Sequence, residues 1–179
     1  MNAAIIVTSA RTEDLDTLSR ASIIRVCIAA HREADFDHLF SYIPSGGLHF
    51  LAYREQALVG HAVVTTRWLQ YNEQAILRTA YVDAVAILPE YQNHGIGSTL
   101  MQHLASGIDE YEIACLETER TSFYVRLGWQ EWRGTLAGRK GSELIPTPKQ
   151  TGIMILATPK TPPLDLDGSL TIEYDGRFW

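Results

Sequence analysis

Two periodicities of apolar and polar positions alternate along this chain of 179 residues. Short apolar, partly β-branched runs predict strands over residues 4–9, 48–54, 58–69, 76–88, 113–116, 128–132 and 152–157. Apolar residues at helical spacing predict helices over 18–28 and 97–108, and shorter ones near 35–38 and over 122–127. The strands between 48 and 88 predict an antiparallel meander. The second half alternates strand and helix, so the pattern favours a mixed α/β fold.

Three segments carry no strong periodicity. Residues 134–150 are predicted to form a polar loop, and Pro159, Pro162 and Pro163 a stiff connector. Residues 170–179 form a tail that ends in aromatic side chains. We expect one domain over residues 1–179, with 158–179 as C-terminal connector and tail strand.

Composition and charge narrow the range of functions. The chain is 46% hydrophobic and 20% charged, enough for a packed core, and its formal net charge is -6. An acidic protein does not attract a phosphate backbone but suits a cationic small molecule, so no nucleic-acid partner is expected. Cys27 and Cys115 lie far apart without metal-ligand spacing, which predicts reduced thiols and no metal. The absence of a signal-like or membrane-spanning apolar stretch favours the cytoplasm, with no membrane partner.

A glycine-containing turn, Gln92-Asn93-His94-Gly95-Ile96-Gly97, lies between a predicted strand and a predicted helix. Backbone N–H groups and the helix dipole favour a bound anion such as a pyrophosphate there. Gly95 and Gly97 would permit a tight turn and close approach to phosphate oxygens. The turn lacks the third glycine of the dinucleotide fingerprint and the lysine of a P-loop. Taken by itself, the glycine pair favours an ordinary loop.

The Gln-x-x-Gly-x-Gly turn at the end of a meander strand resembles the acyl-CoA motif of GNAT N-acetyltransferases. Residues 122–129, Ser-Phe-Tyr-Val-Arg-Leu-Gly-Trp, resemble the second GNAT signature. The resemblance implies the GNAT fold, α/β (α+β): a central, mostly antiparallel mixed sheet, splayed at the acyl-CoA strand and flanked by helices. Nearly end to end, the chain resembles the aminoglycoside 2'-N-acetyltransferase branch, through residues 35–38, 45–49, 60–62, 81–86 and a terminal Trp179 after Gly176.

The resemblance implies acetyl-CoA as cofactor, held along one strand and at the glycine turn. The strand, which carries a bulge in the family, would pair with the pantetheine arm and aim the Val85 N–H at the thioester oxygen. The implied cofactor contacts are Val85, Ala86, Ile87, Gln92, Asn93, His94, Gly95, Ile96, Gly97 and Ser98. The alternative for Val85 and Ile87 is ordinary strand core.

Two residues are implied in catalysis. Tyr124 is the candidate general acid, since a phenol is protonated at neutral pH and can serve a departing thiolate. Its alternative is a structural ring packed on the cofactor. Asp83 matches a glutamate of the family that is thought to take the amine proton through water. It is one methylene shorter, and its alternative is a solvated carboxylate at a strand bulge.

The implied acceptor contacts are Asp35, Asp83, Ala84, Cys115, Gln150 and Trp179. In the family the terminal tryptophan and its α-carboxylate reach the acceptor amine; the alternative is a frayed tail. Cys115 and Gln150 replace a serine and an acidic residue, and Arg177 replaces a tail aspartate, so each change removes an anchor for a polycation. His49 and His61 are expected to be satisfied core or surface residues and not ligands.

The leading hypothesis is therefore an antibiotic-resistance enzyme that acetylates the 2'-amine of an aminoglycoside or similar amino sugar, directly in a ternary complex. Alternatives are acetylation of another small amine, such as a polyamine or metabolite, and a non-catalytic acyl-CoA-binding module. The expected partners are a small-molecule amine substrate and, as an open alternative to a monomer, a second copy of the chain in a homodimer.

Overall fold

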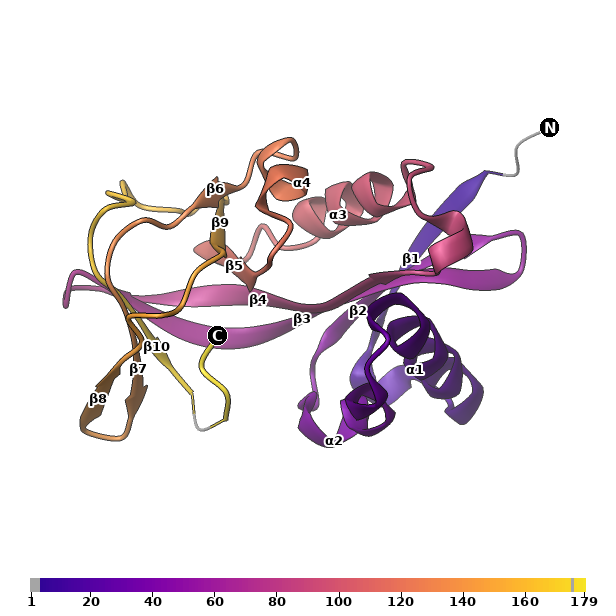
Figure 1. Cartoon of the computed structure of the whole chain (residues 1–179), viewed down its shortest axis with the longest axis horizontal. Coiled ribbons are helices and arrows are strands. Elements are labelled where there is room, and N and C mark those ends of the chain that lie inside the picture. Colours follow the sequence, from indigo (N-terminus) through magenta and orange to yellow (C-terminus); the bar gives the residue numbers. More distant parts are fainter. Residues whose placement is uncertain (1–3, 175) are drawn as a thin grey trace. The chain divides into compact units, whose positions relative to one another are not determined.

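The computed structural model describes residues 4–174 and 176–179 (Figure 1). The chain divides into two compact units. Unit 1 extends to Thr65 and adds Val82–Gly107, whereas unit 2 contains Thr66–Tyr81 and Ile108–Trp179. Two of the three boundaries fall within long strands, β3 (Ala57–Tyr71) and β4 (Ile76–Ile87), so each of these strands contributes to both units.

Unit 1 is built on β1 (Ile5–Arg11) and β2 (Leu48–Arg54), which pair antiparallel, and on the first half of β3, which pairs antiparallel with β2. Its helices are α1 (Thr17–His31), α2 (Leu39–Tyr42) and α3 (Ile96–Ser106), with 3-10 turns η1 (Thr12–Asp14), η2 (Ala34–His38) and η3 (Pro89–Tyr91). In Figure 1, α1 and α2 lie on one face of these strands and α3 on the other.

Local signals explain where these helices begin and what they bury. The Asp16 carboxylate accepts the Ser19 N–H at 2.7 Å and so caps α1. Helix α3 buries Leu100, Met101 and Leu104 at helical spacing against β1 and β2. It therefore follows the apolar period predicted from the sequence.

Unit 2 holds the rest of the sheet, in the order β6-β9-β5-β4-β3-β10-β7-β8. The strands are β5 (Ile113–Glu117), β6 (Gln130–Glu131), β7 (Leu136–Lys140), β8 (Glu143–Pro146), β9 (Ile153–Ala157) and β10 (Leu170–Glu173), with helix α4 (Thr121–Val125). The pairs β4–β5 and β10–β7 are parallel, whereas β10–β3, β5–β9, β6–β9 and β7–β8 are antiparallel. The predicted mixed, mostly antiparallel sheet is confirmed.

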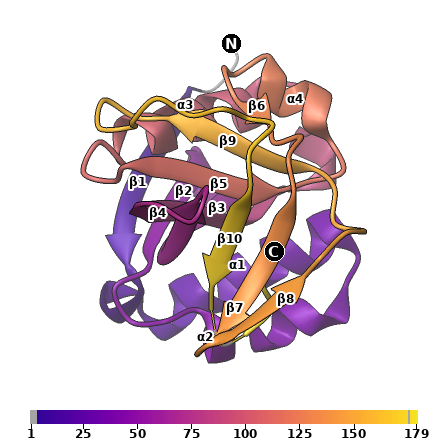
Figure 2. The same cartoon turned by 90° about the vertical axis from the view of Figure 1, so that its left-hand side faces the viewer.

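The prediction of a polar loop over residues 134–150 is wrong. The segment contains the β7–β8 hairpin, which turns at Gly141 with a φ of 57°. Strand β7 is mostly half-buried on both faces, with only Gly138 fully buried, so its sequence lacks the alternation of apolar and polar positions that predicts a strand. Its partner in the sheet is β10, more than thirty residues later in the chain, and Figure 2 shows β10, β7 and β8 side by side. The hairpin is therefore held in the sheet by pairing with a distant strand, which the local sequence pattern does not predict.

Within the described residues, no helix combines the length and apolar character that crossing a membrane requires. Those residues also contain no cluster of three or more His, Cys, Asp or Glu side chains that could hold a metal ion.

Candidate functional site

The glycine turn of unit 1 leads from β4 through η3 into α3. Asn93 and Gly95 both have left-handed backbone conformations, with φ of 63° and 81°. Helix α3 starts directly after Gly95, and among the described residues no side chain caps it. Its first helical bond runs from the Thr99 N–H to the Gly95 carbonyl at 3.0 Å. The N–H groups of Ile96, Gly97 and Ser98 therefore precede the helical ladder and face outward from the helix start.

The turn fits an anionic group such as a pyrophosphate. A Cβ built on Gly95 would meet no atom within 4 Å, so there is open space in front of the backbone. The Gln92 side-chain amide donates to the Ile87 carbonyl at 3.0 Å, and His94 Nδ1 donates to the Gln92 carbonyl at 2.6 Å. These two side chains stiffen the turn, which leaves the backbone N–H groups to bind an anion.

Strand β4 is irregular at Ala84, which has a φ of 49°. The Asp83 carboxylate accepts the Ala84 N–H at 2.8 Å. The Ala84 carbonyl lies 2.9 Å from His61 Nδ1, so both peptide groups of this residue contact side chains. We call this feature the Ala84 kink. The kink lies next to Val85, in the strand where the family resemblance predicts a bulge.

His61 belongs to a buried polar chain that links several elements of unit 1. His61 Nε2 lies 2.9 Å from His49 Nδ1, and His49 Nε2 lies 3.0 Å from Thr12 Oγ1. Both imidazoles are fully buried. Burial lowers the pKa of His49 to about 4 and that of His61 to about 3, so both rings are neutral at neutral pH.

A second group in unit 1 surrounds Asp83. Burial and then the Asp83 charge raise the pKa of the Cys27 thiol to about 12. Tyr42 is 45% exposed, but partial burial of its hydroxyl, followed by the charges of Asp83, Cys27 and Asp35, raises its pKa to about 12. The charges of Asp35 and Asp83, two residues predicted to contact the acceptor, thus both act on Tyr42, a phenol that the sequence analysis missed. Tyr42 lies at the end of a short helix and carries no motif that could have identified it.

In unit 2, Tyr124 lies on α4 and is 6% exposed. Its ring makes edge contacts with Phe123 and Trp129, at centroid distances of 5.0 and 5.8 Å. Gly128 has a φ of 89°, and the Trp129 N–H returns to the Tyr124 carbonyl at 3.1 Å. The left-handed glycine therefore turns the chain after α4 so that Trp129 folds back onto Tyr124. Burial raises the Tyr124 pKa to about 12, so its hydroxyl is protonated at neutral pH.

The C-terminal tail is anchored in unit 2. Trp179 is 4% exposed, and its indole N–H donates to Thr147 Oγ1 at 3.1 Å. Phe178 lies so close to Gly138 that a Cβ there would come within 2.1 Å of the ring. Arg67, on β3, donates to the Phe178 carbonyl at 3.0 Å and stacks between the rings of Tyr81 and Tyr174. The tail is docked and not frayed.

Glu117 is an acidic residue near this tail that the sequence analysis missed. Its carboxylate accepts a hydrogen bond from the Gln150 side chain at 2.8 Å and pairs with the Arg177 guanidinium. Gln150 also helps line a hollow of about 400 Å³ with Thr147, Pro148 and Lys149. Cys115, in contrast, has no exposed surface, and burial raises the pKa of its thiol. Arg177 thus sits in a charge pair with Glu117.

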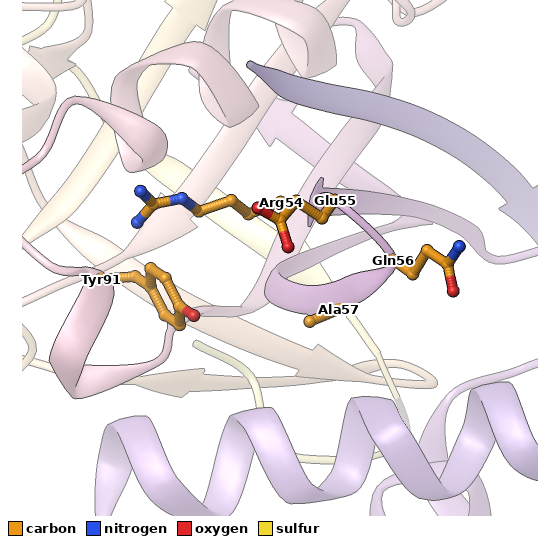
Figure 3. A pocket seen from close by; sticks show the side chains of 5 residues that line it. All are labelled: Arg54, Glu55, Gln56, Ala57 and Tyr91. Carbon is orange, nitrogen blue, oxygen red and sulfur yellow. The ribbon is translucent and has the colours of Figure 1, made fainter. Parts of the chain in front are cut away.

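A larger hollow, of about 770 Å³, lies at the β2–β3 turn of unit 1. It is lined by Arg54, Glu55, Gln56, Ala57 and Tyr91, and Figure 3 shows the side chains of Arg54 and Tyr91 next to each other. The Arg54 guanidinium carbon is 5.5 Å from the Tyr91 ring centroid. None of the site residues predicted from the sequence is among these five.

Comparison with known proteins identifies the domain. A family model described as an acetyltransferase (GNAT) domain matches residues 45–131. The chain carries a GNAT acetyltransferase domain. An aminoglycoside 2'-N-acetyltransferase from Mycolicibacterium fortuitum is 28% identical, over 94% of this chain and 89% of the relative.

Solved structures share the GNAT fold at low identity. A GNAT family acetyltransferase from Brucella melitensis, in complex with acetyl-CoA, is 15% identical over 94% of this chain and 95% of that one, with a TM-score of 0.61. A GCN5-related N-acetyltransferase from Kribbella flavida is 17% identical over 75% of this chain, with a TM-score of 0.59. This chain covers only 34% of the length of the Kribbella protein. The predicted family, fold and enzyme class, an acetyl-CoA-dependent acyltransferase, are confirmed at the level of the GNAT family.

The neutral histidine pair of the GNAT domain predicts sensitivity to acid. The unfolded chain protonates both imidazoles near pH 6.5, whereas the folded chain resists protonation down to about pH 4 for His49 and about pH 3 for His61. Between pH 6.5 and pH 5, unfolding therefore takes up protons, and stability falls as the pH falls. The slope approaches about 1.4 kcal/mol per pH unit for each proton taken up. Urea unfolding at several pH values measures it.

This pH window lies above the range in which most carboxylates titrate. The exposed His38 provides the control, since His38→Gln is expected to leave the slope unchanged. A free energy of unfolding that stays constant from pH 6.5 to pH 5 would contradict a neutral, buried pair.

Proposed function

We propose that this GNAT domain acetylates the 2'-amine of an aminoglycoside, or of a similar cationic amino sugar, by direct transfer from acetyl-CoA in a ternary complex. The observation that carries the proposal is the relationship to an aminoglycoside 2'-N-acetyltransferase across 94% of the chain. The net charge of -6 supports a cationic acceptor, because the excess negative charge of the protein attracts a polycation from a distance.

Cofactor binding is assigned to the turn and to the second half of β4. The N–H groups of residues 95–98 would hold the pyrophosphate, and Val85, Ala86 and Ile87 would pair with the pantetheine arm. Bound acetyl-CoA supplies an acetyl group activated as a thioester. The Val85 N–H would donate a hydrogen bond to the oxygen on which negative charge develops.

Proton transfer is assigned to Asp83 and Tyr124. Asp83 would accept the proton that the acceptor amine loses, directly or through water. Tyr124 would donate a hydrogen bond to the departing thiolate. With a Tyr124 pKa of about 12, complete proton transfer to a thiolate of ordinary pKa near 8.5 is uphill by about 5 kcal/mol. We therefore assign Tyr124 a hydrogen-bonding role. The acceptor ammonium loses two protons on becoming an amide: Asp83 would accept one, and the other would end on the departing sulfur.

Acceptor binding is assigned to acidic and polar groups in each unit. In unit 1 these are Asp35 and Asp83, together with the backbone at Ala84. In unit 2 they are Gln150, the Trp179 carboxylate and Cys115, whose thiol would need to become exposed. We add Tyr42 and Glu117 to this set, because Tyr42 lies within the field of Asp35 and Asp83, and Glu117 bonds Gln150.

Regiochemistry tests this proposal. Gentamicin and tobramycin carry a 2'-amine, whereas kanamycin A has a hydroxyl at that position. We expect one acetyl group on the first two and none on kanamycin A, because the amine that meets the thioester sets the product. Mass spectrometry after incubation with acetyl-CoA measures the added acetyl groups. Products on none of the three would overturn the aminoglycoside assignment, and acetylation of polyamines instead would favour another small amine.

Tyr124→Phe keeps the aromatic contacts but removes the hydroxyl. We expect kcat to fall about 10- to 1,000-fold with little change in acetyl-CoA affinity, because the lost hydrogen bond forms only as the thiolate departs. Steady-state kinetics and calorimetry measure the two quantities. Tyr111→Phe is a matched control, since it removes another buried tyrosine hydroxyl of unit 2, bonded to Thr66 Oγ1 at 3.0 Å. An unchanged kcat in the Tyr124 variant would leave this residue a packing role.

The Arg177–Glu117 pair predicts that the tail weakens polycation binding. The Arg177 side chain is 79% exposed, so the pair contributes little to stability. Arg177→Ala removes a positive charge and releases the Glu117 carboxylate, so KM for tobramycin is expected to fall about 2- to 5-fold at unchanged kcat. The difference should shrink at high salt. Arg133→Ala, which breaks the exposed Asp167 pair of the same unit, is the control. A higher KM in the Arg177 variant would show that Arg177 itself binds the acceptor.

A further inference from the structure

We propose that His61, held by His49 and Thr12, is a positioning residue that orients the Val85 N–H for acyl transfer through the Ala84 kink. The inference rests on the proposed function, in which the Val85 N–H is the donor to the reacting oxygen. It assigns a role to a histidine that the sequence analysis treated as an ordinary buried residue.

Peptide geometry connects His61 with the Val85 N–H. The carbonyl of Ala84 and the N–H of Val85 belong to one planar trans peptide, so they point in opposite directions. The His61 Nδ1–H donates to that carbonyl at 2.9 Å. Whatever fixes the direction of the carbonyl also fixes the direction of the N–H. His61 therefore acts on the Val85 N–H without touching it.

The hydrogen-bond chain selects a single arrangement of protons. His61 donates from Nδ1 to a carbonyl, which can only accept, so its Nε2 must accept the Nδ1–H of His49. His49 Nε2 must then accept, and the Thr12 hydroxyl, which lies 3.0 Å from it and 3.2 Å from the Gly47 carbonyl, is the donor that this arrangement requires. Reversing the chain would turn the lone pair of His61 Nδ1 toward the Ala84 carbonyl. The Ala84 carbonyl, which can only accept, thus sets the polarity of the whole chain, and the Thr12 hydroxyl completes its other end.

Two neighbouring side chains, Cys27 and Asp83, support the Ala84–Val85 peptide less directly than His61 does. The Cys27 thiol is 4.0 Å from the Ala84 carbonyl and 3.6 Å from His61 Nδ1, and a thiol is a weak donor. Asp83 bonds the N–H of Ala84, which belongs to the preceding peptide. The Asp83 bond therefore holds the kink but leaves the orientation of the Val85 N–H to His61.

A matched pair of substitutions separates positioning from packing. His61→Asn places an amide N–H where Nδ1 lies and can still donate to the Ala84 carbonyl. His61→Gln places its amide near Nε2, which satisfies His49 but leaves that carbonyl without its donor. The response of backbone amides to acetyl-CoA and to CoA in ¹⁵N-labelled protein is measured by NMR, after thermal unfolding shows that both variants are folded.

In the wild type, Gly95 and Gly97 are expected to shift with both ligands, and Val85 to shift more with acetyl-CoA than with CoA, because only acetyl-CoA has the thioester oxygen; this excess shift is the Val85 response. His61→Asn should keep the Val85 response. His61→Gln should lose it while Gly95 and Gly97 respond normally, and its kcat should fall about 10- to 100-fold at unchanged acetyl-CoA affinity. Loss of the Val85 response in both variants, or in neither, would overturn the proposal.

Thr12 provides a second test, away from β4. Thr12→Val removes the hydroxyl at the far end of the chain, which His49 Nε2 needs as a donor, whereas Thr12→Ser keeps it. We expect the valine variant to weaken the Val85 response and lower kcat about 3- to 10-fold, a smaller loss than that of one oxyanion donor, and the serine variant to match the wild type. Equal behaviour of the two would count against the proposal.

If Gly95 and Gly97 of the wild type fail to respond to acetyl-CoA, the cofactor assignment itself is wrong, and this inference fails with it.

Discussion

A hydrogen bond from a buried imidazole to the Ala84 carbonyl maintains the irregular backbone on which the acyl-transfer proposal depends. A left-handed alanine costs roughly 1–2 kcal/mol, and each hydrogen bond to a side chain returns roughly 0.5–1.5 kcal/mol. The bonds from His61 and Asp83 together offset the strain. The His61 bond requires a proton on Nδ1, and in the neutral ring the hydrogen-bond chain through His49 to Thr12 places it there. The acid sensitivity of the fold and the orientation of this peptide therefore depend on the same buried histidine.

In unit 2 a buried cation performs a comparable structural task. Arg67 stacks between two tyrosine rings and donates to the carbonyl of Phe178, which ties the end of the chain to the sheet. Such stacking suits arginine, whose planar, weakly hydrated guanidinium can bond and stack simultaneously. The docked tail places Arg177 where it pairs with Glu117. In the sequence, Arg177 only replaces an acidic anchor of the family. In the structure it pairs with Glu117, so under the proposed function it would compete with a cationic acceptor for that carboxylate.

Much of this architecture follows from local patterns in the sequence. The strand over Leu48–Arg54 has the predicted bounds, and α3 follows its apolar period. The turn at Gly95 and the turn after α4 at Gly128 are predictable as well, because glycine adopts a left-handed backbone without the steric cost of a Cβ. The two motifs that identify the GNAT domain both contain such glycines. Their chemistry is encoded within a few consecutive residues, so the sequence by itself determined family, fold class and cofactor.

Contacts between distant residues decided the rest. The β7–β8 hairpin exists because β10 pairs with β7, a mostly half-buried strand that has no alternating pattern of its own. Glu117 bonds a glutamine and an arginine from other segments, and His61 on β3 bonds Ala84 on the neighbouring β4. Nothing in the sequence near His61 distinguishes a packed imidazole from one that orients a peptide. Hydrogen bonds act over about 3 Å in space, whatever the separation along the chain, so only the tertiary structure could decide which polar side chains meet.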